Sequence, residues 1–275
     1  FDLIQDKCRD HQHPGYREDF DRKWDLLPES LGVGGIPSGK TLNTHMHLME
    51  ALTTLVDADP QPRYRAALAE VTDLLLEKSY DPVGHYAKEP FDMAWNPVPE
   101  GKGRMSTYCG HDVEFAWLLI DAMHALGRSP DTIRPKILGL IDEALEHGFD
   151  NEHGGIAEIG PRGAQVVGDP RYADDLSKEW WEQAEALSAL SMAYRWTGER
   201  KYLNAFEKEW GWVYKYQIDH KDGDWFPDTN WYTGAPQGTL DKGMGGWKTS
   251  YHNGRALMRT DEQLQLILAG SKKPM

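Results

Sequence analysis

F-D-N-E-H-G-G-I, residues 149–156, is a turn sequence whose recurrence indicates the fold. It places an aspartate and two glycines between apolar residues, a composition typical of a tight turn. Three similar stretches are R-D-H-Q-H-P-G-Y (9–16), Y-D-P-V-G-H-Y (80–86) and H-K-D-G-D-W-F (220–226). The turns are 71, 69 and 72 residues apart when they are aligned on Asp10, Asp81, Asp150 and Asp222. A period of this size predicts stacked supersecondary units.

Helical periodicity fills the chain between these turns. Apolar residues recur every three to four positions, and Gly, Ser and Pro stand near the ends of the periodic segments. The expected helices are 42–56, 63–77, 113–126, 130–147, 178–197, 200–217, 251–258 and 261–269. Strand signals are weak and allow only short hairpins near 154 and 222. The sequence therefore predicts an all-α fold of about four hairpins, each with an inner and an outer helix.

Long segments rich in Gly, Pro, Asp and aromatic residues join each outer helix to the next inner helix. They are 28–41, 80–109, 149–177 and 219–249. Loops of this length inside a compact domain are usually functional. Because all of them connect the same ends of the hairpins, we expect them on one active face.

The composition is that of a soluble globular protein, with 40% hydrophobic and 27% charged residues in 275. We expect one catalytic domain over 1–275. The net charge of −14 argues against a nucleic-acid partner, and the lack of a long apolar run argues against a membrane partner. Cys8 and Cys109 are too few for a disulfide framework, so a reducing, cytoplasmic compartment is expected.

The first residues, F-D-L-I-Q-D-K-C-R (1–9), are typical of the last turns of an amphipathic helix. We therefore expect an N-terminally truncated domain and an open helical arc. Inner helices at the gap would expose apolar surface, which favours self-association.

The starts of the four inner helices share a second pattern. Its first position holds His47, His111, Glu182 or His252, and the position three residues later holds Glu50, Glu114, Glu185 or Arg255. Residues three apart share a helix face. A glutamate in a first turn commonly serves only the helix dipole, but repetition in register favours a site. Histidine suits proton transfer near neutral pH.

Other chemistries have weaker support. Three histidines and two glutamates can ligate zinc or iron, but the H-E-x-x-H motif, a cysteine cluster and a dense aspartate loop are all missing. A Gly-rich phosphate loop and a dinucleotide-binding fingerprint are missing as well. The serine-hydrolase motif G-x-S-x-G is missing too. We therefore expect no metal and no cofactor. His45, two residues before His47 on the same helix, cannot point the same way and is expected to support another site residue or to serve packing.

Tryptophans stand beside these polar positions, and they either fill the core or stack on a sugar ring. Trp117 is expected in the core. Trp181 and Trp247, where loops meet helices, are the better stacking candidates.

Four motifs, in the same order over nearly the whole chain, resemble the cellobiose 2-epimerases of the N-acylglucosamine 2-epimerase superfamily. They are N-x-H-x-H-x-x-E-A (43–51), G-H-D-x-E-x-x-W-L-L (110–119), W-W-x-Q-A-E (180–185) and Y-H-N-x-R (251–255). The resemblance implies an (α/α)6 barrel that inverts C2 of the reducing-end glucose of β-1,4 disaccharides without a metal or nucleotide. The first hairpins of that family, with an arginine and an aromatic residue near the sugar, have no counterpart in this chain.

By this resemblance His111 and His252 are the acid/base pair. The positions implied to contact or support the substrate are Asn43, His47, Glu114, Trp117, Trp181, Glu185 and Trp247. The substrate is expected to be a disaccharide or monosaccharide.

Three other functions stay open. An aldose–ketose isomerase of the mannose type would return the proton to C1 instead of C2. A catalytically impaired homologue would bind carbohydrate without turnover. A glycoside hydrolase would need two carboxylates that bracket the glycosidic bond, and Glu114 with Glu185 is the evident pair.

Overall fold

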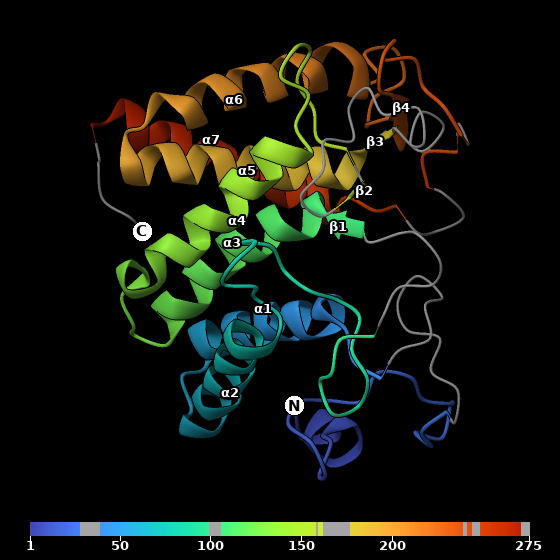
Figure 1. Ribbon diagram of the computed structural model, residues 1–275, viewed down its shortest axis with the longest axis vertical. Helices are drawn as coiled ribbons and strands as arrows, with labels where there is room; N and C mark the ends of the chain where they lie inside the picture. The colour runs from blue at the N-terminus through green and yellow to red at the C-terminus, as the bar shows by residue number, and fades with distance from the viewer. Residues whose placement is uncertain are drawn as a thin grey trace. The chain divides into compact units, whose positions relative to one another are not determined.

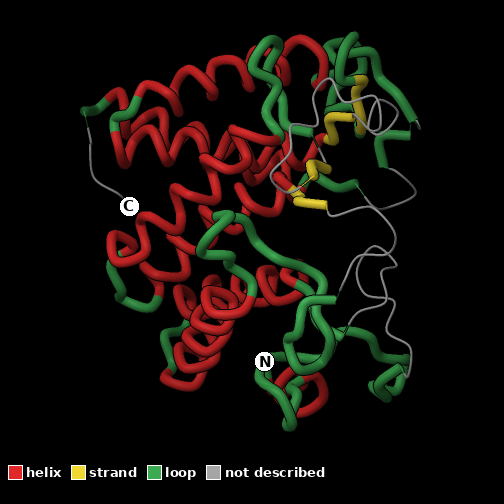
Figure 2. Tube along the Cα trace, viewed as in Figure 1, coloured by secondary structure: helices red, strands yellow, loops and turns green. Residues whose placement is uncertain are grey.

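The computed structural model describes residues 1–27, 39–98, 106–157, 159–161, 177–238, 241–243 and 248–270. This part of the chain is mostly helical, with a few short strands (Figure 2). It divides into two compact units, of which the first holds residues 1–104 and 118–132 and the second holds 105–117 and 133–275. In the described ranges, no helix is long and apolar enough to span a bilayer.

The first unit is built around one helical hairpin. Helices α1 (Leu42–Ala58) and α2 (Pro62–Lys78) pack through buried apolar residues such as Met46 and Val71. The Thr41 side chain caps α1 by accepting a hydrogen bond from the Thr44 N–H at 3.1 Å, and Pro62 at the start of α2 suits a position without an intrahelical N–H bond. Near the N-terminus, Ile4–Cys8 forms a single π-helical turn.

The division between the units passes through α3 (Cys109–Ala125), which begins in the second unit. A 3₁₀ turn (Pro130–Ile133), where the chain returns to the second unit, leads into α4 (Arg134–His147). Helix α5 (Trp180–Thr197) packs against both α6 (Arg200–Trp212) and α7 (Tyr251–Leu268) (Figure 1). A π-helical turn (Val213–Gln217) extends α6. Because α5 is buried almost all round, it is the core of this unit.

Two short antiparallel strand pairs lie beside the helix starts. Strand β1 (Ser106–Tyr108) pairs with β2 (Ile159–Pro161), and β3 (Ser177–Glu179) pairs with β4 (Asp228–Asn230). Strand β1 runs directly into α3, and β3 runs directly into α5. The pairing therefore fixes where two of the inner helices begin.

The periodic turns are Asx turns, in which the Asp side chain accepts the N–H two residues later. Asp10, Asp81 and Asp150 have this geometry. In the fourth turn the residue with this geometry is Asp219, whose Oδ1 accepts the Lys221 N–H at 2.9 Å. The alignment on Asp222 is therefore wrong, and the last step is 69 residues.

Most expected helices agree with the structure within a few residues, but the last pair does not. The predicted break between 258 and 261 is absent, and α7 continues through it. No glycine or proline interrupts this stretch, and Thr260 is buried, so the helical pattern of burial persists.

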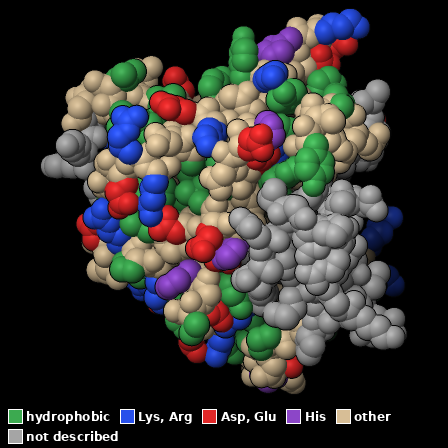
Figure 3. Space-filling model, turned by 45° about the horizontal axis from the view of Figure 1, so that its top comes forward, with side chains coloured by type: hydrophobic (Ala, Val, Ile, Leu, Met, Phe, Trp, Pro, Cys, Tyr) green, Lys and Arg blue, Asp and Glu red, His purple; other side chains and the backbone are tan. Residues whose placement is uncertain are grey.

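Acidic and basic side chains are intermixed with apolar ones on the face drawn in Figure 3. The described residues on that face therefore form a mixed, solvated surface rather than a field of one sign.

Candidate active site

Two imidazoles of the second unit pack on one indole. The ring centroid of Trp181, at the start of α5, lies 5.0 Å from that of His111 on α3 and 5.5 Å from that of His252 on α7. Trp181 is 7% exposed. Three helix starts thus bring the two histidines that are expected to act as acid and base to the same indole.

Gly110 makes this close approach possible. A Cβ atom at this position would lie 2.6 Å from both the Trp181 ring and the Glu182 side chain. Real Cβ atoms do not come this close, so the start of α3 needs a glycine where it meets α5.

His252 is oriented by a carboxylate from a different helix. Its Nδ1 lies 2.6 Å from Oε1 of Glu185, which is fully buried on α5. A carboxylate accepts hydrogen bonds, so we assign the hydrogen to Nδ1 and leave Nε2 as the atom with a free lone pair. Nε2 is therefore the nitrogen that can take up a proton from a substrate.

Glu185 is a carboxylate held by three donors. Besides His252, it accepts the Trp117 Nε1–H at 2.8 Å and the Arg255 Nη2–H at 2.7 Å. Burial alone would raise the pKa of Glu185, but the hydrogen bond from His252 and the charge of Arg255 outweigh burial and lower this pKa. Glu185 thus stays ionised beside His252.

Arg255 joins the two buried glutamates. Its Nη2 donates to Oε1 of Glu114 at 2.8 Å as well as to Glu185, and its guanidinium lies 4.7 Å from the centroid of the Trp117 ring. Trp117 is 1% exposed. Trp117 thus donates a hydrogen bond to Glu185 and packs against Arg255. Because the indole is buried, it has no open ring face for a sugar.

Glu114, Glu185 and His252 also form a cluster with the spacing of a metal site, since one ligand atom of each lies within 4.8 Å of the others. Arg255 Nη2 already contacts the Oε1 atoms of both glutamates. A metal ion there would have to displace this guanidinium or lie against its positive charge, so the cluster fits an arginine better than a metal ion.

The remaining predicted residues belong to the first unit or fall outside the described residues. Asn43 and His47 are on α1 in the first unit, where His47 Nδ1 is 3.2 Å from Glu50 on the same helix. His45 is fully buried, and both of its ring nitrogens bond to the backbone, which confirms its packing role. Trp247 lies outside the described residues.

The sequence prediction of the site omitted Arg255, although the repeated pattern contains it. Arg255 occupies the phase that holds glutamate in the other three helix starts. A basic residue among acidic counterparts is a signal for a charge pair, but its partners become visible only when α7 packs against α5.

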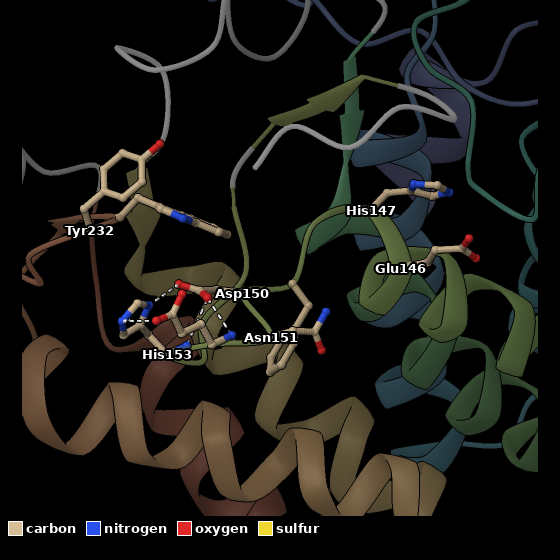
Figure 4. A pocket seen from close by; sticks show the side chains of 9 residues that line it. Glu146, His147, Asp150, Asn151, His153 and Tyr232 are labelled. Atoms are coloured by element: carbon tan, nitrogen blue, oxygen red, sulfur yellow. Dashed lines mark hydrogen bonds and ion pairs between the residues drawn. The ribbon is translucent and has the colours of Figure 1, made fainter. Parts of the chain in front are cut away.

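A separate pocket of about 250 Å³ lies at the Asp150 turn. Figure 4 shows Glu146 and His147 at one end of it and His153 and Tyr232 at the other. It includes neither of the two site histidines, so we do not assign the reaction to it.

Comparisons with known proteins agree with this arrangement of helices. The model of the N-acylglucosamine 2-epimerase (GlcNAc 2-epimerase) family matches residues 1–256. A cellobiose 2-epimerase from Ruminococcus albus is 32% identical over 253 residues, which cover 89% of this chain and 59% of that protein. A D-mannose isomerase from Marinomonas mediterranea is 25% identical over 82% of this chain and 55% of that protein.

The structure of cellobiose 2-epimerase from Spirochaeta thermophila matches with a TM-score of 0.82 and 30% identity, over 98% of this chain and 63% of that one. The chain therefore belongs to the N-acylglucosamine 2-epimerase family, and the expected (α/α)6-barrel type of fold is confirmed. It spans less than two thirds of the length of these relatives.

Proposed function

We propose that this chain is the catalytic part of a sugar 2-epimerase that acts on the reducing-end glucose of a β-1,4 disaccharide such as cellobiose. One observation carries the proposal: two imidazoles pack against a single indole, and one of them is oriented by a buried carboxylate. The similarity to cellobiose 2-epimerases supports the substrate class.

The reaction needs proton transfer at both faces of one carbon. After the sugar ring opens, one histidine removes the proton from C2, and the electron pair of the C–H bond forms an enediolate between C1 and C2. The other histidine returns a proton to C2 from the opposite face, so no oxidant or reductant is consumed. Two positioned imidazoles suit such transfer near neutral pH.

Glu185 serves this chemistry through His252. Its hydrogen bond to Nδ1 fixes the tautomer and the orientation of the ring, which leave Nε2 as the nitrogen that can take a proton. Arg255 and Trp117 hold the carboxylate in place. Glu185 and Arg255 are therefore positioning groups, and the histidines carry the proton.

A glycoside hydrolase agrees less well with this geometry. Glu114 and Glu185 are both fully buried, and both bond to the same nitrogen of Arg255. Two carboxylates that share one guanidinium nitrogen do not bracket a glycosidic bond.

An aldose–ketose isomerase is the second candidate, because a D-mannose isomerase is among the relatives. The two reactions share the enediolate and differ in whether the proton returns to C2 or C1.

Turnover of cellobiose in heavy water separates the candidates. We expect the mannose-ended epimer with deuterium at C2, and unchanged activity after chelation and dialysis. A ketose product with deuterium at C1 would establish the isomerase. Cellobiose binding without any turnover would indicate a carbohydrate-binding homologue, and activity restored only by added metal would overturn the histidine mechanism.

A further inference from the structure

A buried lysine stands just before three of the inner helices. Lys40 lies two residues before α1, Lys178 two residues before α5 and Lys248 three residues before α7. Their side chains are at most 1% exposed, and each Nζ is 2.6 to 2.9 Å from the carboxylate of an aspartate in the preceding turn. These aspartates are Asp10, Asp150 and Asp224. A charge is expensive to bury unless it is paired, and each of these pairs clamps a turn to the start of a helix.

Lys178 is fully buried in its clamp. Its Nζ donates to Asp150 Oδ2 at 2.9 Å and to the Gly154 carbonyl at 2.6 Å. The same ammonium lies 3.3 Å from the ring centroid of Trp212 and 4.2 Å from that of Trp231. A cation between two indole faces, bound to a carboxylate and a carbonyl, is held from several sides. Figure 4 shows the Asp150 end of this clamp beside the pocket.

The Lys178 clamp lies close in the sequence to the indole against which the two imidazoles pack. Lys178 is the middle residue of β3, which runs into α5, and Trp181 follows three positions later. The Trp181 indole contacts both His111 and His252. A shift of β3 would therefore move the surface against which both imidazoles pack.

We propose that Lys178 is a positioning residue of the active site, which holds β3 against the Asp150 turn and so fixes the Trp181 indole relative to the two histidines. Its effect on catalysis rests on the proposed function. A buried ion pair is seldom a strong source of stability, since apolar replacements are often as stable. We therefore assign the clamp to the positioning of β3 and the Trp181 indole rather than to stability.

The test compares Lys178→Met with Lys88→Met in the full chain. Lys88 belongs to an equivalent turn, but its Nζ is 3.9 Å from Asp81 and both side chains are 22% exposed, so it is a matched control. The ring current of Trp181 makes the imidazole NMR signals of His111 and His252 sensitive to its position. We expect both signals to move in Lys178→Met only.

We also expect kcat for cellobiose to fall about tenfold or more in Lys178→Met, with a smaller change in KM, as for a misplaced catalytic group. Asp150→Asn removes the same charge pair with almost no change in shape, and it decides the matter if Lys178→Met does not fold. Unchanged imidazole signals in a folded variant would overturn the proposal, and so would moved signals with unchanged kcat. If the signals move but the wild-type chain turns over no sugar, the positioning role stands and the proposed function fails.

Discussion

The starts of α1 and α7 carry the same kind of pattern, yet their histidines have different surroundings. In α1, His47 pairs with Glu50 one turn away, and their side chains are 31% and 20% exposed. In α7, His252 is 12% exposed and pairs with Glu185 from α5. The first pair supports its own helix, whereas the second joins two helices and fixes a tautomer. Two histidines at the same position of the repeated pattern therefore need not have the same role.

Breaking the pair between helices should have the largest effect. In Glu185→Gln, His252 and Arg255 lose a buried charged partner, so we expect turnover to fall by about 10²-fold or more. We also expect the free energy of unfolding to fall by about 3 kcal/mol, because a buried charge loses its partner. Steady-state kinetics and urea denaturation measure the two effects. Activity within a few-fold of wild type would show that Glu185 does not orient His252.

Crowding the contact between α3 and α5 should have an intermediate effect. The added Cβ of Gly110→Ala meets the Trp181 ring, and such overpacking costs about 1–3 kcal/mol. We expect a lower Tm and a lower kcat. Gly211→Ala is the control, since nothing lies within 4 Å of a Cβ at that helical position. Equal behaviour of the two variants would argue against a tight contact at Gly110.

The second unit should also lose stability as the pH rises towards 8. Burial raises the pKa of Glu209 to about 8, from an ordinary value of 4.5, despite the opposing charge of Lys178. The folded state therefore keeps a proton that the unfolded chain releases. This contribution is complete below pH 4.5 and is lost as the pH rises through 8.

Urea denaturation at pH 5.5 and 7.5 measures this loss, and we expect up to about 2 kcal/mol in the wild type. Glu209→Gln should remove most of the difference, because the amide does not ionise. Lys178, whose burial lowers its pKa to about 8, titrates mainly above this window. A variant as pH-dependent as the wild type would contradict the assignment to Glu209.

The smallest effect is expected at the start of α1. Glu50→Gln removes a half-exposed pair within one helix, which is worth about 0.2–0.5 kcal/mol. Thermal unfolding should show a shift near the limit of detection. A loss as large as that of Glu185→Gln would mean that His47 and His252 have equivalent surroundings.

The sequence predicts much of this fold because its signals are local. Apolar periodicity locates the helices, and the repeated Asp turns locate the connections between them. The prediction is wrong where two aspartates compete for one turn, as Asp219 and Asp222 do in the fourth turn, and where the burial of Thr260 lets α7 continue as one helix. For the site, the helix phase locates His252 and Glu185, but their pairing depends on the packing of α7 on α5.

The central claim is that His111 and His252 each serve one face of C2, and solvent exchange in single variants tests it most directly. His111→Ala and His252→Ala are incubated in heavy water with cellobiose and, separately, with its mannose-ended epimer. We predict that epimerisation falls by about 10²-fold or more in both variants, while each still exchanges deuterium into C2 of one epimer, and a different one in each variant. Continued epimerisation, or exchange into both epimers by a single variant, would contradict the two-histidine account.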